Sequence, residues 1–353
     1  MLAFLRKYSV RPPIGIPASY LLMLRAIFSR SARDSLYQYL KDLFPGYDVR
    51  LFEEGRQAFG FLLETQSFKT ISIQSLTCPV MIFEAAHRGV MRVQDESAEL
   101  MVKTVIWGKS GKESREIGAS LMDACQIYPS LLKPEDDYIL LSFNESKPAP
   151  GFGGGALLCK SSLKVSENLD SRVKLSKLFR GIIFRFFQKL VYTPFLYAFL
   201  KKISAKKIGS TYSIESTQPD RPVLMSNFKA FLALKALKDS AMLKKRRDSL
   251  YLRANNILAG NKKYSTSYEL GYTSSHQYFL LPKKEYQTYI ESTLDDCGIS
   301  FFQPHRYDLE DLDDLKPRVF DRDLRFAICL PMNFSENESQ RLLKKIRQLH
   351  EKV

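Results

Sequence analysis

The sequence predicts an α/β fold with a mostly parallel central sheet and a smaller α+β C-terminal domain. Of the 353 residues, 45% are hydrophobic, which is enough to bury one large core or two smaller ones. Short apolar runs alternate with amphipathic stretches over residues 53–160, as strands and helices do in a parallel sheet with ligand groups at the strand ends. Residues 261–353 contain shorter strands mixed with helices, which indicates a second, smaller domain.

The elements of the first half are expected in the following order. A helix over residues 31–43 follows an apolar N-terminal arm, and a turn at Gly55 starts a helix that ends near residue 66. The next elements are a strand at 69–75, a helix at 79–89 and strands at 90–95, 103–108, 119–124 and 138–143.

The second half begins with one long predicted helix over residues 225–258. A strand at 276–282, a helix at 283–298, strands at 299–304 and 326–333, and a helix from Ser335 follow. The chain is therefore divided into an N-terminal arm and helix (1–50), a large α/β domain (51–170), an insert (171–210), a linking helix (211–260) and a small α+β domain (261–353).

Basic and aromatic residues gather in the predicted insert. The chain has a net charge of +15, which favours an anionic partner, and residues 171–207 alone contain ten Lys and Arg and no acidic residue. The longest uncharged run, 190–200, is too short to cross a bilayer, which needs roughly 20 residues. Amphipathic helices over 172–207 that lie on an anionic membrane surface fit better, while a core helix hairpin with solvated basic residues remains the alternative. No nucleic-acid motif accompanies the charge, and the basic segment 243–253 is interpreted as a solvated helix face.

Cysteine and histidine usage favours a reduced, cytoplasmic protein without a metal site. The five cysteines are an odd number without metal-type spacing, and the four histidines are scattered. The N-terminus reaches a charged residue after five residues, too early for a signal-peptide core. We expect a cytoplasmic location, with peripheral attachment at the inner face of the membrane if the insert binds lipid.

One segment, LSFNESKPAPGFGGGALLCK at 141–160, presents a lysine between prolines and glycines. Lys147 follows a strand that ends at Ser142, and Asp123 ends the preceding strand, with Gln126 three residues later. The turn Gly55-Arg56-Gln57 opens a helix whose free N–H groups could bind a phosphate. An amine, a carboxylate and a phosphate cradle are the groups that pyridoxal phosphate requires: the lysine condenses with its aldehyde and the carboxylate keeps its ring nitrogen protonated.

These residues resemble the DegT/StrS family of sugar aminotransferases. The family pattern has an Asp-Ala-Ala-Gln-like turn, then Phe-Ser-Phe, a lysine, and Gly-Gly seven residues beyond that lysine; the matching positions are Asp123, Gln126, Ser142, Lys147, Gly154 and Gly155. GRQAFGFLL, SLTCPVMIFEAAHRGVMRVQD, SNFKAFLALKAL and the C-terminal segments follow in the family's order over nearly the whole chain.

The resemblance implies a fold-type-I enzyme that binds pyridoxal 5'-phosphate and acts as a homodimer. Lys147 is then the catalytic lysine, and the implied cofactor-binding residues are Asp123, Gln126, Ser142, Gly55, Arg56, Gln57, Cys78 and Asn227, the last of which reaches the phosphate of the neighbouring subunit. The implied reaction moves an amino group, with glutamate as the expected donor, to a keto-sugar that is nucleotide- or lipid-linked, in the synthesis of surface polysaccharide or glycolipid.

Several positions depart from the family pattern. Phe152 and Gly153 stand where an acidic residue often precedes Gly-Gly, Cys78 stands where an aromatic residue often stacks on the cofactor, and Lys229 replaces an arginine. Only 28 positions separate Asp95 from Asp123, so a crossover helix is shortened or lost. This shortening supports the alternative of a non-catalytic scaffold in a membrane-associated assembly, whereas the retention of a lysine and an aspartate opposes it. Related dehydratases carry histidine in place of the lysine.

Overall fold

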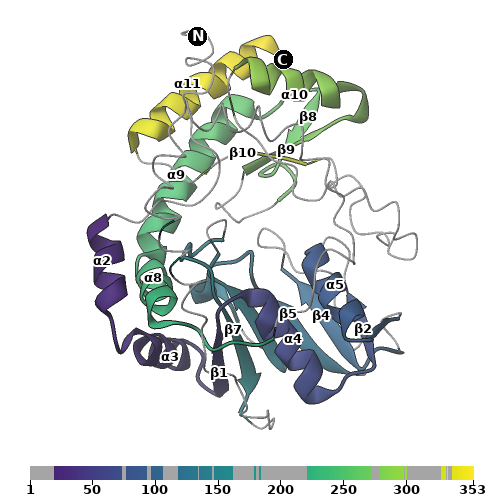
Figure 1. Ribbon diagram of the computed structural model, residues 1–353. Coiled ribbons are helices and arrows are strands. Elements are labelled where there is room, and N and C mark those ends of the chain that lie inside the picture. The colour runs from purple at the N-terminus through teal and green to yellow at the C-terminus, as the bar shows by residue number, and fades with distance from the viewer. Residues whose placement is uncertain are drawn as a thin grey trace.

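The computed structural model describes residues 20–73, 77–93, 97–105, 118–133, 135–144, 147–161, 179, 183, 221–271, 278–297, 299, 327–330, 332 and 336–353. These residues form a large domain around a seven-stranded sheet and a small domain around a three-stranded sheet, with one long helix running between them (Figure 1). The fold class is therefore the α/β architecture that the sequence predicts.

The large sheet has the strand order β1-β7-β6-β5-β4-β2-β3. The strands are β1 (Tyr47–Phe52), β2 (Thr70–Ile73), β3 (Met91–Arg92), β4 (Leu100–Thr104), β5 (Ala119–Asp123), β6 (Tyr138–Ser142) and β7 (Gly155–Lys160). Strands β3, β2, β4, β5 and β6 pair in parallel, whereas β7 is antiparallel to both of its neighbours, β6 and β1. Consequently β1 runs in the same direction as β6, and the sheet is mostly parallel.

Three details of the large domain differ from the sequence prediction. The strand predicted at 103–108 starts too late in the sequence, because the observed strand is β4 (Leu100–Thr104). The segments YDVRLF and GALLCK were not predicted as strands, yet they form β1 and β7 and pair along their whole length. Residues 105–118 join β4 to β5, which is close to the minimum of about a dozen residues that a parallel crossover needs.

Helices cover both faces of this sheet. Helices α3 (Ala32–Leu43) and α8 (Asn227–Lys238) bury one core with inward residues of β1, β6 and β7. Helices α4 (Gly55–Gln66) and α5 (Pro79–His87) bury the other core, against the opposite side chains of β6 and the apolar residues of β2 and β4. Leu140 and Leu141 show this alternation, because they are neighbours in β6 and belong to the two different cores.

The long predicted helix over 225–258 is two helices, α8 and α9 (Ser240–Leu258), which meet at Asp239. The small domain contains β8 (Tyr264–Thr266), β9 (Tyr278–Pro282) and β10 (Ile328–Leu330) in the order β10-β9-β8, together with α10 (Gln287–Asp296) and α11 (Glu336–Lys352). Its core includes residues from the second half of α9, so α9 belongs to both domains (Figure 1).

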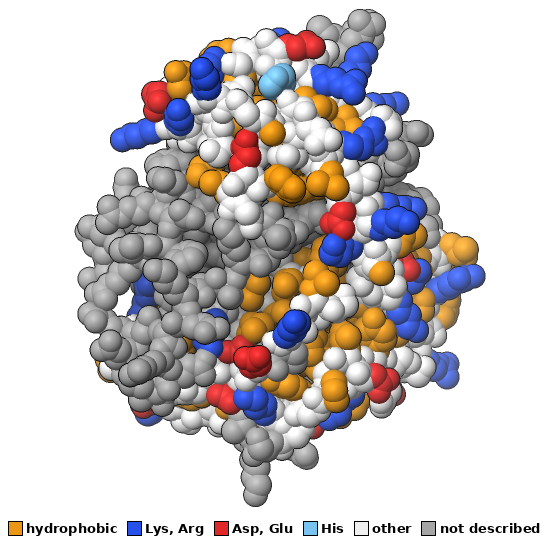
Figure 2. All heavy atoms as spheres, turned by 180° about the vertical axis from the view of Figure 1, so that it is seen from behind, with side chains coloured by type: hydrophobic (Ala, Val, Ile, Leu, Met, Phe, Trp, Pro, Cys, Tyr) orange, Lys and Arg blue, Asp and Glu red, His pale blue; other side chains and the backbone are white. Residues whose placement is uncertain are grey.

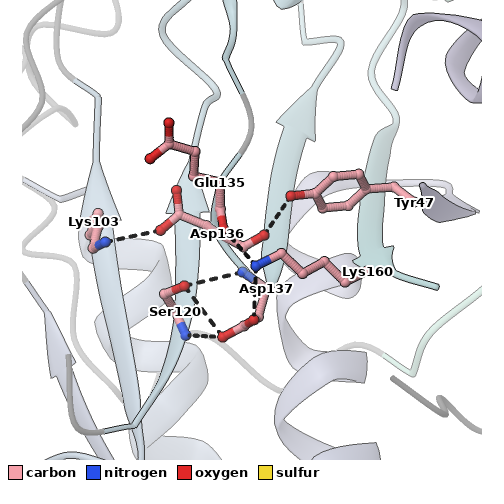
Figure 3. A network of polar contacts seen from close by, with 7 residues as sticks. All are labelled: Tyr47, Lys103, Ser120, Glu135, Asp136, Asp137 and Lys160. Atoms are coloured by element: carbon pink, nitrogen blue, oxygen red, sulfur yellow. Dashed lines mark hydrogen bonds and ion pairs between the residues drawn. The ribbon is translucent and has the colours of Figure 1, made fainter. Parts of the chain in front are cut away.

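A polar network fixes the edge of the sheet at which β5 and β6 begin (Figure 3). Lys160 Nζ donates to the Glu135 carbonyl at 2.6 Å and pairs with Asp137, whose Oδ2 accepts from the Ser120 N–H at 3.0 Å. Tyr47 Oη donates to the Asp136 carbonyl at 2.6 Å; burial, followed by the nearby acidic side chains, raises the pKa of Tyr47 to about 12, which keeps it a donor. The network ties β7 and β1 to the loop that enters β6.

Helix α2 (Tyr20–Phe28) packs beside α8 and leaves apolar side chains exposed. Ala26 is fully buried, but 61% of Leu21 and 78% of Phe28 are exposed. Seen from behind, further hydrophobic side chains gather over the lower part of the molecule, which holds the large sheet (Figure 2). Among the described helices, none is both long and apolar enough to span a membrane. The basic insert 172–207 lies outside the described residues, apart from Phe179 and Ile183, whose side chains are exposed.

Candidate active site

The predicted site residues follow strands that end at one edge of the large sheet. Asp123 ends β5 and Ser142 ends β6, and these strands are adjacent and parallel. Helix α4 begins at Gly55, just after β1, which runs parallel to β6. Cys78 immediately precedes α5, which follows β2. The carboxyl ends of the parallel strands therefore collect groups from four separate chain segments, as is typical of ligand sites in such sheets.

Glycines let the start of α4 approach the strand ends closely. A Cβ atom on Gly155 would lie 2.4 Å from Gly55 Cα, so only glycine fits at the start of β7. A Cβ atom on Gly55 would lie 3.4 Å from both Cβ and Oγ of Ser142. The backbone of α4 thus begins directly beside the Ser142 hydroxyl, in the position that a phosphate-binding helix start requires.

The first turn of α4 has the features of an anion site. Glu54 provides no side-chain cap, and the first turn contains no acidic residue that would neutralise the positive end of the helix dipole. Gln57 is only 4% exposed, and its Oε1 has no hydrogen-bond partner among the described residues. Arg56 turns its guanidinium toward Glu54, with Nε 3.0 Å from Oε2. Arg56 would therefore contribute mainly through its backbone.

A tightly hydrogen-bonded loop presents Lys147. The Phe143 N–H donates to the Gly154 carbonyl at 2.9 Å, and the Phe143 carbonyl accepts from the N–H groups of Gly151 and Gly153. Gly153 and Gly154 both have positive φ angles, near +98° and +97°, which favour glycine at both positions, including Gly153 just before the Gly-Gly pair. The Lys147 N–H donates to the Asn144 carbonyl at 3.1 Å, so the half-buried lysine is held at the tip of a closed loop.

Asp123 and Lys147 act on the same two thiols. Asp123 is 4% exposed, and its Oδ1 accepts from the Cys125 N–H at 3.1 Å. Desolvation raises the pKa of the Cys78 and Cys125 thiols; the Asp123 charge raises these pKa values further, while the Lys147 charge lowers them. The carboxylate and the amine therefore flank one small region that also contains Cys78, the residue expected beside a cofactor ring.

Two other predicted residues have different surroundings. Gln126 is half-buried in the turn after β5, three residues beyond Asp123. Asn227 is the first residue of α8, and its Oδ1 accepts from the Arg33 N–H at 2.9 Å, at the start of α3. Within one chain Asn227 thus joins two helices, and the prediction that it reaches a neighbouring subunit's phosphate stays a prediction. Asp95 lies outside the described residues.

Lys229, which replaces an arginine of the family pattern, forms an ion pair instead of extending freely. Its Nζ lies 2.6 Å from Glu53 Oε2 and donates to the Glu53 carbonyl at 2.8 Å. The other carboxylate oxygen of Glu53 accepts from the Ser226 N–H at 2.7 Å. This buried pair joins the end of β1 to the start of α8, and so it fixes the residues just before the α4 turn.

Sequence reasoning missed Arg247. The segment 243–253 was interpreted as a solvated helix face, but this interpretation is wrong for Arg247, which is 3% exposed. Its Nη1 donates to the Pro148 carbonyl and to Tyr128 Oη, both at 2.7 Å. A signal was present, because Leu243, Arg247, Leu250 and Tyr251 share a helical spacing and all four are buried.

The residues present fit pyridoxal 5'-phosphate. The uncapped start of α4 beside Ser142 offers N–H and hydroxyl donors for a phosphate. A side chain at Gly155 would displace this helix start. The unpartnered Gln57 Oε1 is a buried polar atom that a polar ligand could satisfy. The buried carboxylate of Asp123 at the end of β5 and Lys147 in the loop after the adjacent strand β6 complete the set that the sequence predicts.

No protein-family model and no curated protein sequence matches the chain. Solved structures do match it over nearly its whole length. PseC from Helicobacter pylori, an aminotransferase involved in the biosynthesis of pseudoaminic acid, is 15% identical, with a TM-score of 0.64 over 98% of this chain and 99% of its own. The putative sugar aminotransferase Spr1654 from Streptococcus pneumoniae is 15% identical, with a TM-score of 0.65 over 97% of this chain and 99% of its own in the PMP form.

The same fold also occurs in a dehydratase, GDP-4-keto-6-deoxymannose-3-dehydratase (ColD). It is 11% identical, with a TM-score of 0.63 over 95% of this chain and 100% of its own. The likeness to all three proteins extends through both domains and the helix between them. The chain therefore has the fold-type-I architecture of the DegT/StrS-type sugar aminotransferases and of their dehydratase relative.

Proposed function

We propose that this chain is a divergent member of the DegT/StrS family, a pyridoxal-phosphate-dependent aminotransferase that acts on a keto-sugar. The observation that carries the proposal is that Asp123 ends β5 and Lys147 lies in the loop after the adjacent parallel strand β6, on the edge of the sheet where Ser142 lies beside the uncapped start of α4. The fold shared with PseC and Spr1654 supports it, since both are described as aminotransferases and Spr1654 as a putative sugar aminotransferase.

Each residue has a role that follows from its position. When bound, pyridoxal phosphate supplies an electron sink that stabilises negative charge at the α-carbon of the amino donor. The Asp123 carboxylate would hold a proton on the ring nitrogen, and the backbone of α4 with Ser142 Oγ would bind the phosphate. The Lys147 amine would hold the cofactor covalently and, when free, would take the proton from the donor α-carbon. As a general base, the amine must be neutral.

Borohydride trapping tests the role of Lys147. Wild-type protein incubated with pyridoxal phosphate should become yellow, and reduction with borohydride should leave a stable adduct that peptide mass spectrometry locates on Lys147. Lys147→Ala should show neither effect, whereas Lys133→Ala, which removes an exposed lysine in the loop before β6, should behave as wild type. An adduct on other lysines only, with Lys147 unmodified, would reject the proposal.

The identity of the amino donor and the type of reaction are tested separately. Glutamate should convert the loaded protein to its pyridoxamine form in a single turnover, which absorbance records. Loaded protein that no candidate amino acid converts would favour the non-catalytic scaffold, which the short β4–β5 connection supports. The dehydratase alternative is disfavoured because such relatives carry histidine in place of the lysine, and this chain carries Lys147.

A homodimer is part of the same proposal. Leu21, Leu24 and Phe28 expose an apolar face on α2, and Asn227 lies at the start of α8, against which α2 packs. A second copy of the chain would cover this face. Light scattering after gel filtration should give twice the mass of 40.6 kDa, and Leu24→Glu should shift the protein toward monomer. A mass for wild type equal to that of a single chain would remove the dimer from the proposal.

We also propose that the insert 172–207 holds the enzyme at an anionic membrane, where a lipid-linked keto-sugar could be the acceptor. Its basic and aromatic composition supports contact with anionic lipid. Wild-type protein should float with vesicles of phosphatidylglycerol and phosphatidylcholine but not with phosphatidylcholine alone, and a variant without the insert should not float with either. Flotation that survives the deletion would exclude the insert as the anchor.

A further inference from the structure

Proline residues leave the loop that carries Lys147 with few ways of being held. Pro148 and Pro150 follow the lysine on either side of Ala149 and have no N–H group. The hydrogen bonds described above hold the loop near Phe143 and through the lysine N–H. Between the lysine and Gly151, Ala149 has the one backbone N–H, so the middle of the loop is held mainly through its carbonyl groups.

Arg247 supplies a donor at this point. Its Nη1 lies 2.7 Å from the carbonyl oxygen of Pro148, which directly follows Lys147 in the sequence. The same nitrogen donates at 2.7 Å to Tyr128 Oη, and the guanidinium carbon lies 5.8 Å from the centre of the Tyr128 ring. Tyr128 is 1% exposed and lies in the segment that follows Asp123. One buried nitrogen thus links the chain segment after Asp123 to the loop that carries Lys147.

The arginine is buried at a cost that packing does not explain. No acidic side chain among the described residues pairs with it, and its Nε and Nη2 have no hydrogen-bond partner there. Burial of a charged group is unfavourable, and hydrophobic residues of similar volume often replace even buried ion pairs without loss of stability. A residue that served stability alone would be better replaced by an apolar side chain.

We propose that Arg247 is a positioning residue, which sets the distance between the Lys147 amine and the Asp123 carboxylate by tying together the two segments that carry them. The proposal rests on the proposed function only for its catalytic consequence. Charge-assisted hydrogen bonds are stronger than neutral ones, so the loss of this donor should loosen the lysine loop while the rest of the fold persists.

The variants Arg247→Met, Arg247→Lys and Tyr128→Phe separate positioning from stability. Arg247→Met keeps the volume and removes a buried charge, but it also removes the donor to the Pro148 carbonyl and Tyr128 Oη. Because these effects oppose each other, its urea midpoint should stay close to that of wild type. Arg247→Lys retains one charged donor and should restore part of the function, and Tyr128→Phe leaves the bond to the Pro148 carbonyl intact. A purely structural role predicts the reverse for Arg247→Met: lower stability with unchanged behaviour of each folded molecule.

The first measurement does not depend on any cofactor. Amide hydrogen exchange in the cofactor-free protein should be about tenfold faster or more in peptides that cover residues 144–155 of Arg247→Met, in line with the loss of one charged hydrogen bond. Peptides from β9 in the small domain should exchange as in wild type. Unchanged exchange at 144–155 would overturn the proposal, whatever the protein catalyses.

The second measurement uses protein loaded with pyridoxal phosphate. Arg247→Met should lower the single-turnover rate by about 100-fold, as expected for a reacting group displaced by about 1 Å, and should shift the pH at which the bound chromophore changes colour. Arg247→Lys should recover part of both. If wild type never binds the cofactor but exchange at 144–155 still responds to Arg247→Met, the proposed function fails and the positioning role stands.

Discussion

Substitution of Gly155 by alanine tests the contact on which the proposed phosphate cradle depends. The new methyl carbon would lie 2.4 Å from Gly55 Cα, 2.8 Å from Gly55 N and 3.0 Å from the Leu141 carbonyl oxygen. Carbon atoms in contact normally lie about 3.5–4 Å apart, so the start of α4 must move by about 1 Å. All three neighbours are backbone atoms, which cannot rotate away as the end of a side chain could.

Overpacking of this kind costs about 1–3 kcal/mol, and the backbone neighbours place the expected loss in the free energy of unfolding at about 3 kcal/mol. Gly55→Ala is the matched control, because its methyl group would meet Ser142 at 3.4 Å, an ordinary contact, and should change stability by less than about 0.5 kcal/mol. Urea unfolding of both cofactor-free variants, followed by circular dichroism, measures the difference. Equal midpoints for the two variants would show that α4 does not approach β7 as described.

Three further predictions concern the residues around this cradle. Asp123→Asn should still bind pyridoxal phosphate but lower the single-turnover rate by about 100-fold or more, because a neutral amide cannot hold a proton on the ring nitrogen; a rate near that of wild type would contradict this. Desolvation raises the pKa of the Cys78 thiol, so alkylation by iodoacetamide at pH 8 should be slower than for a free thiol and should accelerate as the pH rises. Lys147→Met should slow this alkylation and Asp123→Asn should speed it, since the two charges act on the thiol in opposite directions, and equal rates in all three proteins would separate Cys78 from the site. Lys229→Met should lower the free energy of unfolding by about 3 kcal/mol because it leaves Glu53 buried without its partner. The control Lys235→Met breaks an exposed pair on the same helix and should cost less than about 0.5 kcal/mol. Similar losses for the two variants would show that burial of the first pair is unimportant.

The order of elements in the large domain was largely predicted, but two strands were missed. β7 directly follows Gly153 and Gly154, and the glycine-rich run directed attention to a turn rather than to the strand behind it. In β1, Asp48 and Arg50 alternate with apolar residues, which is a local strand signal that was overlooked, whereas its pairing with β7 could not be predicted from that signal. Pairing between residues far apart in sequence is invisible to a local pattern.

The residues of the candidate site were predicted from the order of motifs in the sequence. The parallel sheet explains how these residues come together. The sequence placed Asp123 and Ser142 at strand ends, and parallel pairing of those strands brings them to one edge. Arg247 was missed because a basic residue among Lys244, Lys245 and Arg246 resembles its solvated neighbours, although its helical spacing from Leu243 and Tyr251 indicates the buried face. The groups that hold it there, the Pro148 carbonyl and the Tyr128 hydroxyl, lie far from it in the sequence and could not be predicted.

The join between α8 and α9 was missed for a related reason. Neither glycine nor proline marks the break, and the residue at the join, Asp239, still has helical backbone angles. Its carboxylate accepts from Lys235 Nζ at 2.6 Å, an interaction that a continuous helix would equally allow. Only the packing of α8 on the large sheet and of α9 on the small domain separates the two helices.

The chain leaves the large domain before the basic insert at one end of β1 and returns after it at the other end. β7 ends at Lys160, which pairs with Tyr47 at the start of β1, and the chain returns beside the other end, where Leu224 bridges Phe52 and the Val223 carbonyl accepts from the Glu53 N–H. The six residues of β1 span about 20 Å, a gap that about seven extended residues can cross. A Gly-Ser bridge of about that length would therefore be long enough to replace residues 162–220, and such a variant would allow the proposed lipid attachment to be tested apart from the proposed sugar chemistry.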